Sequence, residues 1–266
     1  MERISSRQNA LVRQFREVAQ GAIADGVLLD GEHLIEEALT SGVAIEVAAF
    51  TERLASGPLA RRLQTTKTKA VIVSDAVLDA MSPMQSPSGA MAIARRPDTS
   101  LDGVFANTPE LILMLHDVQD PGNVGAVVRA AEGCGATGIV CGERTADPFG
   151  WKAVRGAMGS SFRVPLATKQ SLPDAIERAR EKRLRIFATT VRGGTPLADC
   201  DLCVPSAIVL GGEGSGLPEA LIDAADERLT IPMRAPVESL NVAIAAALIV
   251  YEAARQRHAD RVHVAL

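Results

Sequence analysis

The sequence LILMLHDVQDPGNVGAVVRAAEGCGATGIVC, residues 111–141, contains two short apolar runs on either side of a segment with helical spacing. The runs, Leu111–Leu115 and Gly138–Cys141, are typical of strands that are buried on both faces of a sheet. A helix is predicted between them, over Asn123–Gly133. Parallel strands joined by a helix form a βαβ unit, so this stretch predicts a parallel sheet that helices cover on both faces.

The same alternation continues toward the C-terminus. The predicted elements are helices over Trp151–Ser160, Leu172–Arg183, Leu217–Ala225 and Leu240–Arg257, strands over Arg185–Thr190, Ala207–Leu210 and Arg228–Ile231, and an extended segment over Phe162–Leu166. Sheets of this kind bind ligands beyond the carboxyl ends of their strands. We therefore expect a site in the loops that follow the strands.

The N-terminal part of the chain has the pattern of a smaller α/β unit. Its predicted helices cover Arg7–Gln20, Glu32–Ser41 and Ser74–Met81, and its predicted strands cover Val27–Leu29, Ile45–Phe50, Ala70–Val73 and Gly89–Ala94. A turn-rich segment follows over Arg95–Pro109, and such segments commonly separate domains. We therefore predict two domains, residues 1–105 and 106–266.

The composition narrows the class of protein. The 266 residues are 47% hydrophobic and 23% charged, with a net charge of −4, which excludes a disordered chain and a basic nucleic-acid-binding tail. Aromatic residues make up only 3%, which argues against base stacking as the main mode of recognition. The longest apolar run, Val242–Tyr251, is too short to span a bilayer, and the N-terminus lacks an apolar signal segment, so we expect a cytoplasmic protein. Cys200 and Cys203 lack the second pair that a zinc site needs, so no metal is expected.

Three loops at the carboxyl ends of predicted strands carry residues suited to chemistry. The first, HDVQDPGNVG at residues 116–125, leads into a helix that carries Arg129. Asn123 and Arg129 are too far apart along the helix to share a face, so Asn123 is expected to cap the helix or to lie in the loop. Taken alone, this loop fits a capped helix with an exposed arginine as well as it fits a site.

The second loop, GGEGSG at residues 211–216, follows a strand but matches neither common phosphate-binding fingerprint. Its Glu213 would repel a phosphate and suits a cationic or hydroxyl-bearing ligand. The third loop, residues 231–243, places Ser239 and Asn241 before an apolar helix, where helix capping is an ordinary explanation for both. The alanine-rich helix that follows permits close packing, either in the core or against a second subunit.

Together the three loops resemble the three motifs of the SpoU/TrmH family of RNA 2′-O-ribose methyltransferases, which use S-adenosylmethionine. The matching stretches are DPGNVG at 120–125 with Arg129, LGGEGSGL at 210–217, IPM at 231–233 and SLNV at 239–242. The resemblance spans Leu111–Arg257. Residues 6–9 (SRQN) and 29–33 (LDGEH) also resemble the ribosomal-protein-like substrate-binding domain that precedes many catalytic domains of the family.

The resemblance implies a parallel-sheet α/β domain with a deep C-terminal trefoil knot, assembled as a homodimer. It implies a pocket for the methyl donor lined by Thr189, Thr190, Gly211, Gly212, Gly216, Ile231, Met233 and Leu240. It also implies that Arg129 is the central catalytic residue, with Asn123, Glu213, Ser239 and Asn241 orienting the arginine, the ribose and the donor. A guanidinium is a poor general base because it holds its proton tightly, so we expect Arg129 to hold the target phosphate and orient the hydroxyl. The group that accepts the proton stays open.

Two locally basic stretches, Arg53–Lys69 and Arg144–Lys169, could contact RNA despite the acidic net charge. The residues that we expect to contact phosphates are Arg61, Arg62, Lys152 and Arg155. The extra N-terminal domain favours ribosomal RNA, of the large subunit, as the substrate. A tRNA 2′-O-methyltransferase of the same family and a non-catalytic RNA-binding protein are the alternatives, and the failed fingerprint disfavours a dinucleotide-dependent oxidoreductase.

Overall fold

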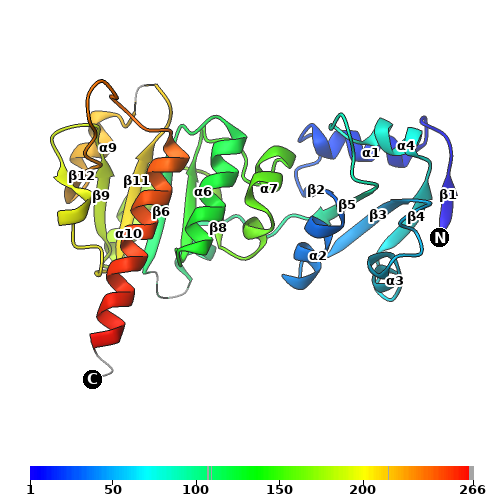
Figure 1. Cartoon of the computed structure of the whole chain (residues 1–266), viewed down its shortest axis with the longest axis horizontal. Coiled ribbons are helices and arrows are strands. Elements are labelled where there is room, and N and C mark those ends of the chain that lie inside the picture. Colours follow the sequence, from blue (N-terminus) through cyan, green and yellow to red (C-terminus); the bar gives the residue numbers. More distant parts are fainter. Residues whose placement is uncertain (107, 109, 215, 264–266) are drawn as a thin grey trace. The chain divides into compact units, whose positions relative to one another are not determined.

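The computed structural model describes residues 1–106, 108, 110–214 and 216–263, with side chains up to residue 257. The chain forms two compact units (Figure 1): the first unit comprises Met1–Pro97 and Phe149–Phe162, and the second comprises Asp98–Pro148 and Arg163–Leu266. This division differs from the boundary predicted between residues 105 and 106. Helix α5, Leu101–Phe105, packs Val104 and Phe105 into the core of the second unit. Asn107 and Pro109 of the predicted boundary lie outside the described residues.

The first unit contains a five-stranded mixed sheet in the order β1-β4-β3-β5-β2. Strands β1, β4 and β3 are parallel, and β5 runs antiparallel to both β3 and β2. The strands are β1 Glu2–Ile4, β2 Gly26–Asp30, β3 Ile45–Thr51, β4 Lys69–Val73 and β5 Ala90–Arg95, and the helices are α1 Ala10–Ala19, α2 Glu32–Thr40, α3 Pro58–Gln64, α4 Asp75–Met81 and α7 Trp151–Ala157. The sequence analysis missed two of these elements. Strand β1 is only three residues long, and α3 lies in the basic stretch, although Pro58 at its start is a helix signal.

The core of the first unit explains why a later segment of the chain belongs to it. Helices α1 and α4 pack residues such as Phe15 and Met81 against one face of the sheet, and the side chain of Trp151 packs against this cluster. Helix α7 also contacts β2. Phe149 contributes a further contact, because the guanidinium of Arg96 lies 4.9 Å from the centre of its ring.

The second unit contains a seven-stranded sheet in the order β10-β12-β9-β11-β6-β7-β8, and every pairing in it is parallel. The parallel sheet predicted from the sequence is therefore confirmed. Helices α6 and α10 lie side by side on one face, and α5, α8 and α9 pack on the other (Figure 1). The strands are β6 Leu111–His116, β7 Gly138–Gly142, β8 Leu166–Gln170, β9 Arg185–Thr189, β10 Thr195–Pro196, β11 Ser206–Gly211 and β12 Glu227–Thr230, and the helices are α6 Pro121–Gly133, α8 Leu172–Glu181, α9 Glu219–Asp223 and α10 Val242–His263.

Two local predictions are wrong. The sequence predicts an extended segment over Phe162–Leu166, but Ser160–Phe162 form a turn of 3₁₀-helix and the next strand, β8, begins only at Leu166. Asn123 does not cap α6, because the helix begins at Pro121 and the Asp120 carboxylate accepts the Asn123 N–H at 2.9 Å. An aspartate directly before a proline is the stronger signal for a helix start.

The strand order brings distant loops to one edge of the sheet. Strand β11 lies between β6 and β9, and β12 lies beside β9. Because all four strands are parallel, the loops that follow them emerge at the same edge, which is where a ligand is expected. Among the helices that the structure describes, none is both long enough and apolar enough to cross a membrane.

Candidate active site

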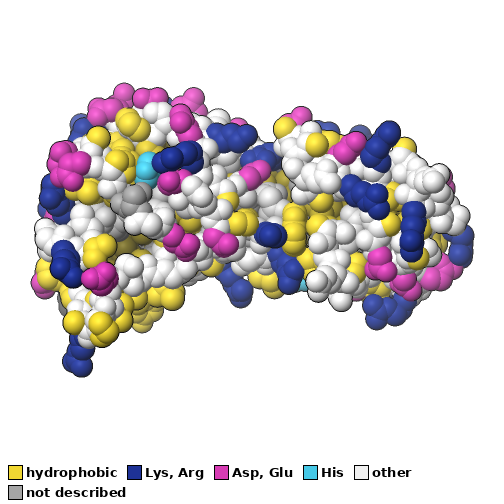
Figure 2. Space-filling view, turned by 90° about the horizontal axis from the view of Figure 1, so that it is seen from above, with side chains coloured by type: hydrophobic (Ala, Val, Ile, Leu, Met, Phe, Trp, Pro, Cys, Tyr) yellow, Lys and Arg dark blue, Asp and Glu magenta, His cyan; other side chains and the backbone are white. Residues whose placement is uncertain are grey.

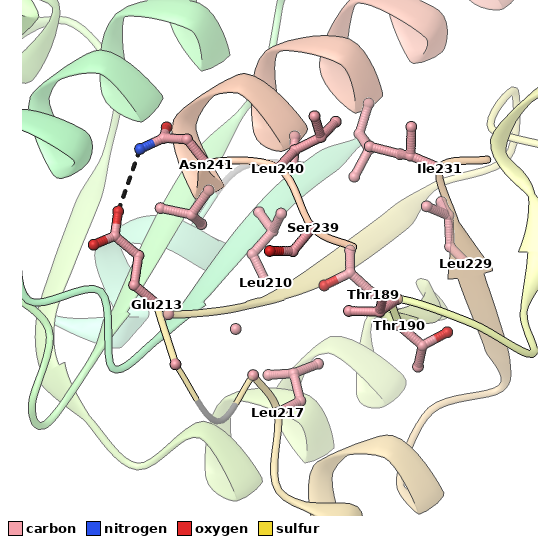
Figure 3. A pocket seen from close by; sticks show the side chains of 18 of the residues that line it. Thr189, Thr190, Leu210, Glu213, Leu217, Leu229, Ile231, Ser239, Leu240 and Asn241 are labelled. Atoms are coloured by element: carbon pink, nitrogen blue, oxygen red, sulfur yellow. Dashed lines mark hydrogen bonds between the residues drawn. The ribbon is translucent and has the colours of Figure 1, made fainter. Parts of the chain in front are cut away.

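A pocket of about 390 Å³ lies at the carboxyl ends of β9, β11 and β12 (Figure 3). This volume falls in the range of small-molecule sites, roughly 300–1,000 Å³. Among the described residues, the pocket is lined by Thr189, Thr190, Val191, Leu210, Gly211, Gly212, Glu213, Gly214, Gly216, Leu217, Leu229, Ile231, Met233, Ser239, Leu240, Asn241, Val242, Ala245 and Ile249.

The predicted residues fall into two groups. The pocket brings together all the residues that the resemblance assigned to the donor, and Glu213, Ser239 and Asn241 with them. Asn123 does not line the pocket but donates a hydrogen bond to Glu213. Of the apolar wall, the resemblance named Ile231, Met233 and Leu240 but not Leu229 or Ile249. Leu229 lies in a strand and Ile249 in an apolar helix, so in the sequence both are indistinguishable from core residues.

The glycine loop meets its neighbours at close range. A Cβ atom on Gly212 would lie 2.5 Å from the carbonyl carbon of Asp117, and one on Gly211 would lie 2.5 Å from that of Gly216. No side chain fits at either position, because both obstacles are backbone atoms. The Gly212 N–H donates to the His116 carbonyl at 2.7 Å, which ties the second loop to the first.

Three polar side chains, one from each loop, form a cluster at one side of the pocket. The amide nitrogens of Asn123 and Asn241 both donate to Glu213 Oε1, the second at 3.2 Å, and Asn241 Nδ2 also lies 3.1 Å from Asn123 Oδ1. The carbonyl side of Asn241 accepts the Ala243 N–H at 2.9 Å, so this residue caps α10 as predicted. The cluster unites loops that are about 90 and 118 residues apart in the sequence.

The opposite side of the pocket carries two threonines whose hydroxyl groups are engaged within the protein. Thr189 Oγ1 donates to the Val209 carbonyl at 3.1 Å, and Thr190 Oγ1 lies 3.4 Å from Thr230 Oγ1. Figure 3 shows both threonines across the pocket from Glu213. Glu213, Ser239 and Asn241 are therefore the polar side chains of the lining best placed to meet a ligand.

An ion pair holds the loop after β6 in place. Asp117 forms an ion pair with Arg144 at 2.9 Å and adopts a left-handed backbone conformation with φ of 55°. Burial lowers the pKa of the adjacent His116, so its imidazole is neutral near pH 7. This arrangement fixes the backbone against which Gly212 packs.

The remaining predicted residues are not part of the pocket lining. Arg129 is exposed on α6, and no described residue pairs with it. Lys152 and Arg155 lie on α7 in the first unit, where Arg155 Nη1 is 2.8 Å from Met84 Sδ, so they are not part of the unit that contains the pocket. Arg61 and Arg62 are exposed in the last turn of α3.

The two cysteines of the C-x-x-C pair differ in environment. Cys200 is buried and Cys203 is exposed. Burial, and secondarily the charge of Glu227, raises the pKa of the Cys200 thiol to about 11. The described residues contain no group of three or more histidine, cysteine or acidic side chains that could hold a metal ion.

Comparison with known sequences finds two families. The SpoU rRNA methylase family matches residues 110–251, and the MRM3-like substrate binding domain matches residues 13–92. The first match covers more than half of the chain and includes all three loops of the pocket.

Individual relatives resemble the chain along nearly its whole length. The 23S rRNA (guanosine(2553)-2′-O)-methyltransferase RlmP of Bacillus subtilis is 30% identical over 255 residues, which are 94% of this chain and 98% of that protein. The structure of an AdoMet-bound rRNA methyltransferase from Sinorhizobium meliloti is 27% identical, has a TM-score of 0.86, and is matched over 96% of this chain and 97% of that chain. The structure of an RNA 2′-O ribose methyltransferase is 30% identical, with a TM-score of 0.81 over 96% of this chain and 99% of that chain.

Proposed function

Because the chain belongs to the SpoU rRNA methylase family, we propose that it transfers a methyl group from S-adenosylmethionine to a ribose 2′-hydroxyl of RNA. The observation that carries this proposal is the pocket itself, where residues of the second and third loops line one cavity of suitable size and Asn123 of the first loop is hydrogen-bonded to Glu213 in its lining. The enzyme resembles RlmP over both domains, which favours large-subunit ribosomal RNA as the substrate. A tRNA substrate is the second candidate.

The residues of the pocket suit S-adenosylmethionine. Apolar side chains such as Leu229, Ile231 and Leu240 offer a surface for its adenine ring, and the tight backbone at Gly211 and Gly212 leaves peptide groups accessible to its polar atoms. When bound, the donor supplies a methyl group that is activated by a sulfonium. No metal ion is needed for this transfer.

The chain's own residues position the acceptor. A ribose hydroxyl is a weak nucleophile, so much of the rate must come from holding it in line with the methyl group. We assign that task to the cluster of Asn123, Glu213 and Asn241, with Ser239 beside it in the pocket. Arg129 supplies a forked cation for the phosphate next to the target ribose.

The first unit is proposed to bind the body of the RNA. It contains the match to a substrate binding domain, and Lys and Arg side chains are spread over the face of it seen in Figure 2. Arg61 and Arg62 on α3, and Lys152 and Arg155 on α7, are the proposed phosphate contacts. We place this activity in the cytoplasm.

A homodimer and a trefoil knot are further parts of the proposal. Helix α10 exposes Ile244, Leu248 and Tyr251, by 54%, 42% and 63%, and their spacing places them on one face. Helix α6 lies beside it, and its exposed residues are Arg129 and the small residues Gly122, Ala126 and Gly133. A second copy of the chain would cover this apolar face. Family membership supports the knot in the second unit.

The test combines binding and product analysis. The purified chain should bind S-adenosylmethionine in a calorimeter and transfer a labelled methyl group to large-subunit ribosomal RNA in preference to tRNA. The modified linkage should resist alkaline hydrolysis, because a methylated 2′-oxygen cannot attack the neighbouring phosphodiester. Methylation of a base instead of a ribose, or no binding of the donor, would refute the proposal.

A further inference from the structure

Methylation of a hydroxyl releases a proton, and the proposed function does not yet say which group accepts it. Resting on that function, we propose that Glu213 is the proton acceptor, through its Oε2 atom. The same carboxylate holds the two asparagines of the cluster through Oε1, so its two oxygens have separate tasks.

The residues that line the pocket include few candidates for the proton acceptor. Among the described residues that line it, Glu213 is the only one with an acidic or basic side chain. The other polar side chains are the hydroxyl groups of Thr189, Thr190 and Ser239 and the amide of Asn241, none of which is a base in water. A guanidinium is a poor base, and Arg129 does not line the pocket.

The surroundings of Glu213 leave one oxygen available and fix the other. Asn241 is fixed as the cap of α10, and Asn123 is fixed in the first turn of α6, so Oε1 is held between two ordered amides. No described residue donates a hydrogen bond to Oε2, and none forms an ion pair with Glu213. Asp117 in the first loop differs from Glu213, because it forms an ion pair with Arg144 at 2.9 Å. Figure 3 shows Glu213 at one side of the pocket with its carboxylate turned toward Asn241.

An orienting role alone does not require an acid at this position. Both partners offer N–H groups, and the amide oxygen of a glutamine would accept them equally well. The cluster therefore does not account for the negative charge of Glu213. Because the reaction releases a proton, we assign that charge to accepting it.

The bonds and electrons of the methyl transfer balance with the Glu213 carboxylate as the proton acceptor. The 2′-oxygen forms a bond to the methyl carbon while the carbon–sulfur bond breaks and its electron pair goes to sulfur, which becomes a neutral thioether. The O–H bond breaks, its electron pair stays on the ether oxygen, and the proton passes to Glu213 Oε2. Because the oxygen becomes strongly acidic as its bond to carbon forms, a carboxylate within reach can accept the proton.

The experiment separates a base from a positioning group. Glu213→Gln keeps an acceptor for Asn123 and Asn241 but cannot take a proton. Its affinity for S-adenosylmethionine should stay within about threefold, whereas its single-turnover rate of methyl transfer should fall by about 10²–10⁴-fold. Glu219→Gln, which removes an exposed acid of α9 outside the pocket, should transfer at the parent rate.

A second variant tests whether the loss of rate comes from the missing carboxylate itself. Glu213→Ala opens space for a small acid, and added formate should restore its rate in proportion to the formate concentration. A Glu213→Gln rate within threefold of the parent, a loss of donor affinity that matches the loss of rate, or no rescue by formate would each overturn the inference. If the parent chain methylates no ribose at all, it is the proposed function that fails.

Discussion

Replacing Gly212 with alanine tests the close approach of the two loops that frame the pocket. The added Cβ would lie 2.5 Å from the carbonyl carbon of Asp117, whereas carbon atoms pack at about 3.5–4.0 Å. The loops would therefore have to separate by at least about 1 Å. This movement would stretch the 2.7 Å bond from the Gly212 N–H to the His116 carbonyl.

The cost can be estimated from its two parts. Forcing a methyl group into a well-packed site costs about 1–3 kcal/mol, and losing a backbone hydrogen bond adds about 0.5–1.5 kcal/mol. A total of roughly 2–4 kcal/mol corresponds to a fall of about 4–16 °C in the melting temperature of a unit of this size. The affinity for S-adenosylmethionine should fall at least tenfold, because the displaced loop lines the pocket.

The assays are thermal denaturation and calorimetry, with Gly133→Ala as the matched control. Gly133 ends α6, and a Cβ on it would meet no atom within 4 Å, so the same added methyl should leave stability unchanged or raise it by up to about 1 kcal/mol. If Gly212→Ala melts within 1 °C of the parent and binds the donor equally well, the loops do not meet as described.

Four other perturbations probe separate parts of the protein. Arg129→Ala should reduce methyl transfer at least 100-fold with little change in donor affinity, and Arg129→Lys should recover only part of it, as rate and calorimetry together would show. Tyr251→Asp should convert the proposed dimer into a monomer of about 28 kDa by light scattering, and a parent already monomeric at micromolar concentration would exclude the dimer. Charge reversal at Arg61 and Arg62 should weaken RNA binding and reduce the salt slope by about 0.7 per lost phosphate contact; an unchanged slope would remove α3 from the RNA interface. Alkylation of Cys200, followed by mass spectrometry, should be slow at pH 8 and accelerate up to about pH 11, because only the thiolate reacts; fast labelling at pH 8 would contradict its burial.

The sequence pattern predicts the strands of the second sheet well, but it does not predict which segments of the chain belong to which unit. Leu111–Leu115 and Ala207–Leu210 are uninterrupted apolar runs of four or five residues, and their short length favours strands buried on both faces of a sheet over helices. The placement of Trp151 in the first unit has no such local signal. It depends on a tertiary contact with a core built from residues between Ile4 and Ile93, and no pattern within the segment records that contact.

The residues of the pocket, too, are only partly predictable from the sequence. The three loops can be identified from their glycines and from polar residues in unusual positions. The strand order that brings the loops together cannot be predicted from the sequence of any one loop. Leu229 and Ile249 line the pocket and also belong to an apolar strand and an apolar helix, so their sequence signal is that of core residues. Local pattern identifies elements, whereas the adjacency of β11, β9 and β12 arises only when the whole sheet forms.

Asn241 illustrates why a site residue can resemble a structural one. Its Oδ1 caps α10 by accepting the Ala243 N–H, while its Nδ2 donates to Asn123 and Glu213. Serine, aspartate and asparagine cap helices about equally well, so capping explains why a polar residue stands at this position but not why it is asparagine. Aspartate would keep the cap and place a second negative charge against Glu213, and serine would lack the reach. Only an amide meets both demands, so the choice of asparagine reflects the cluster and not the helix.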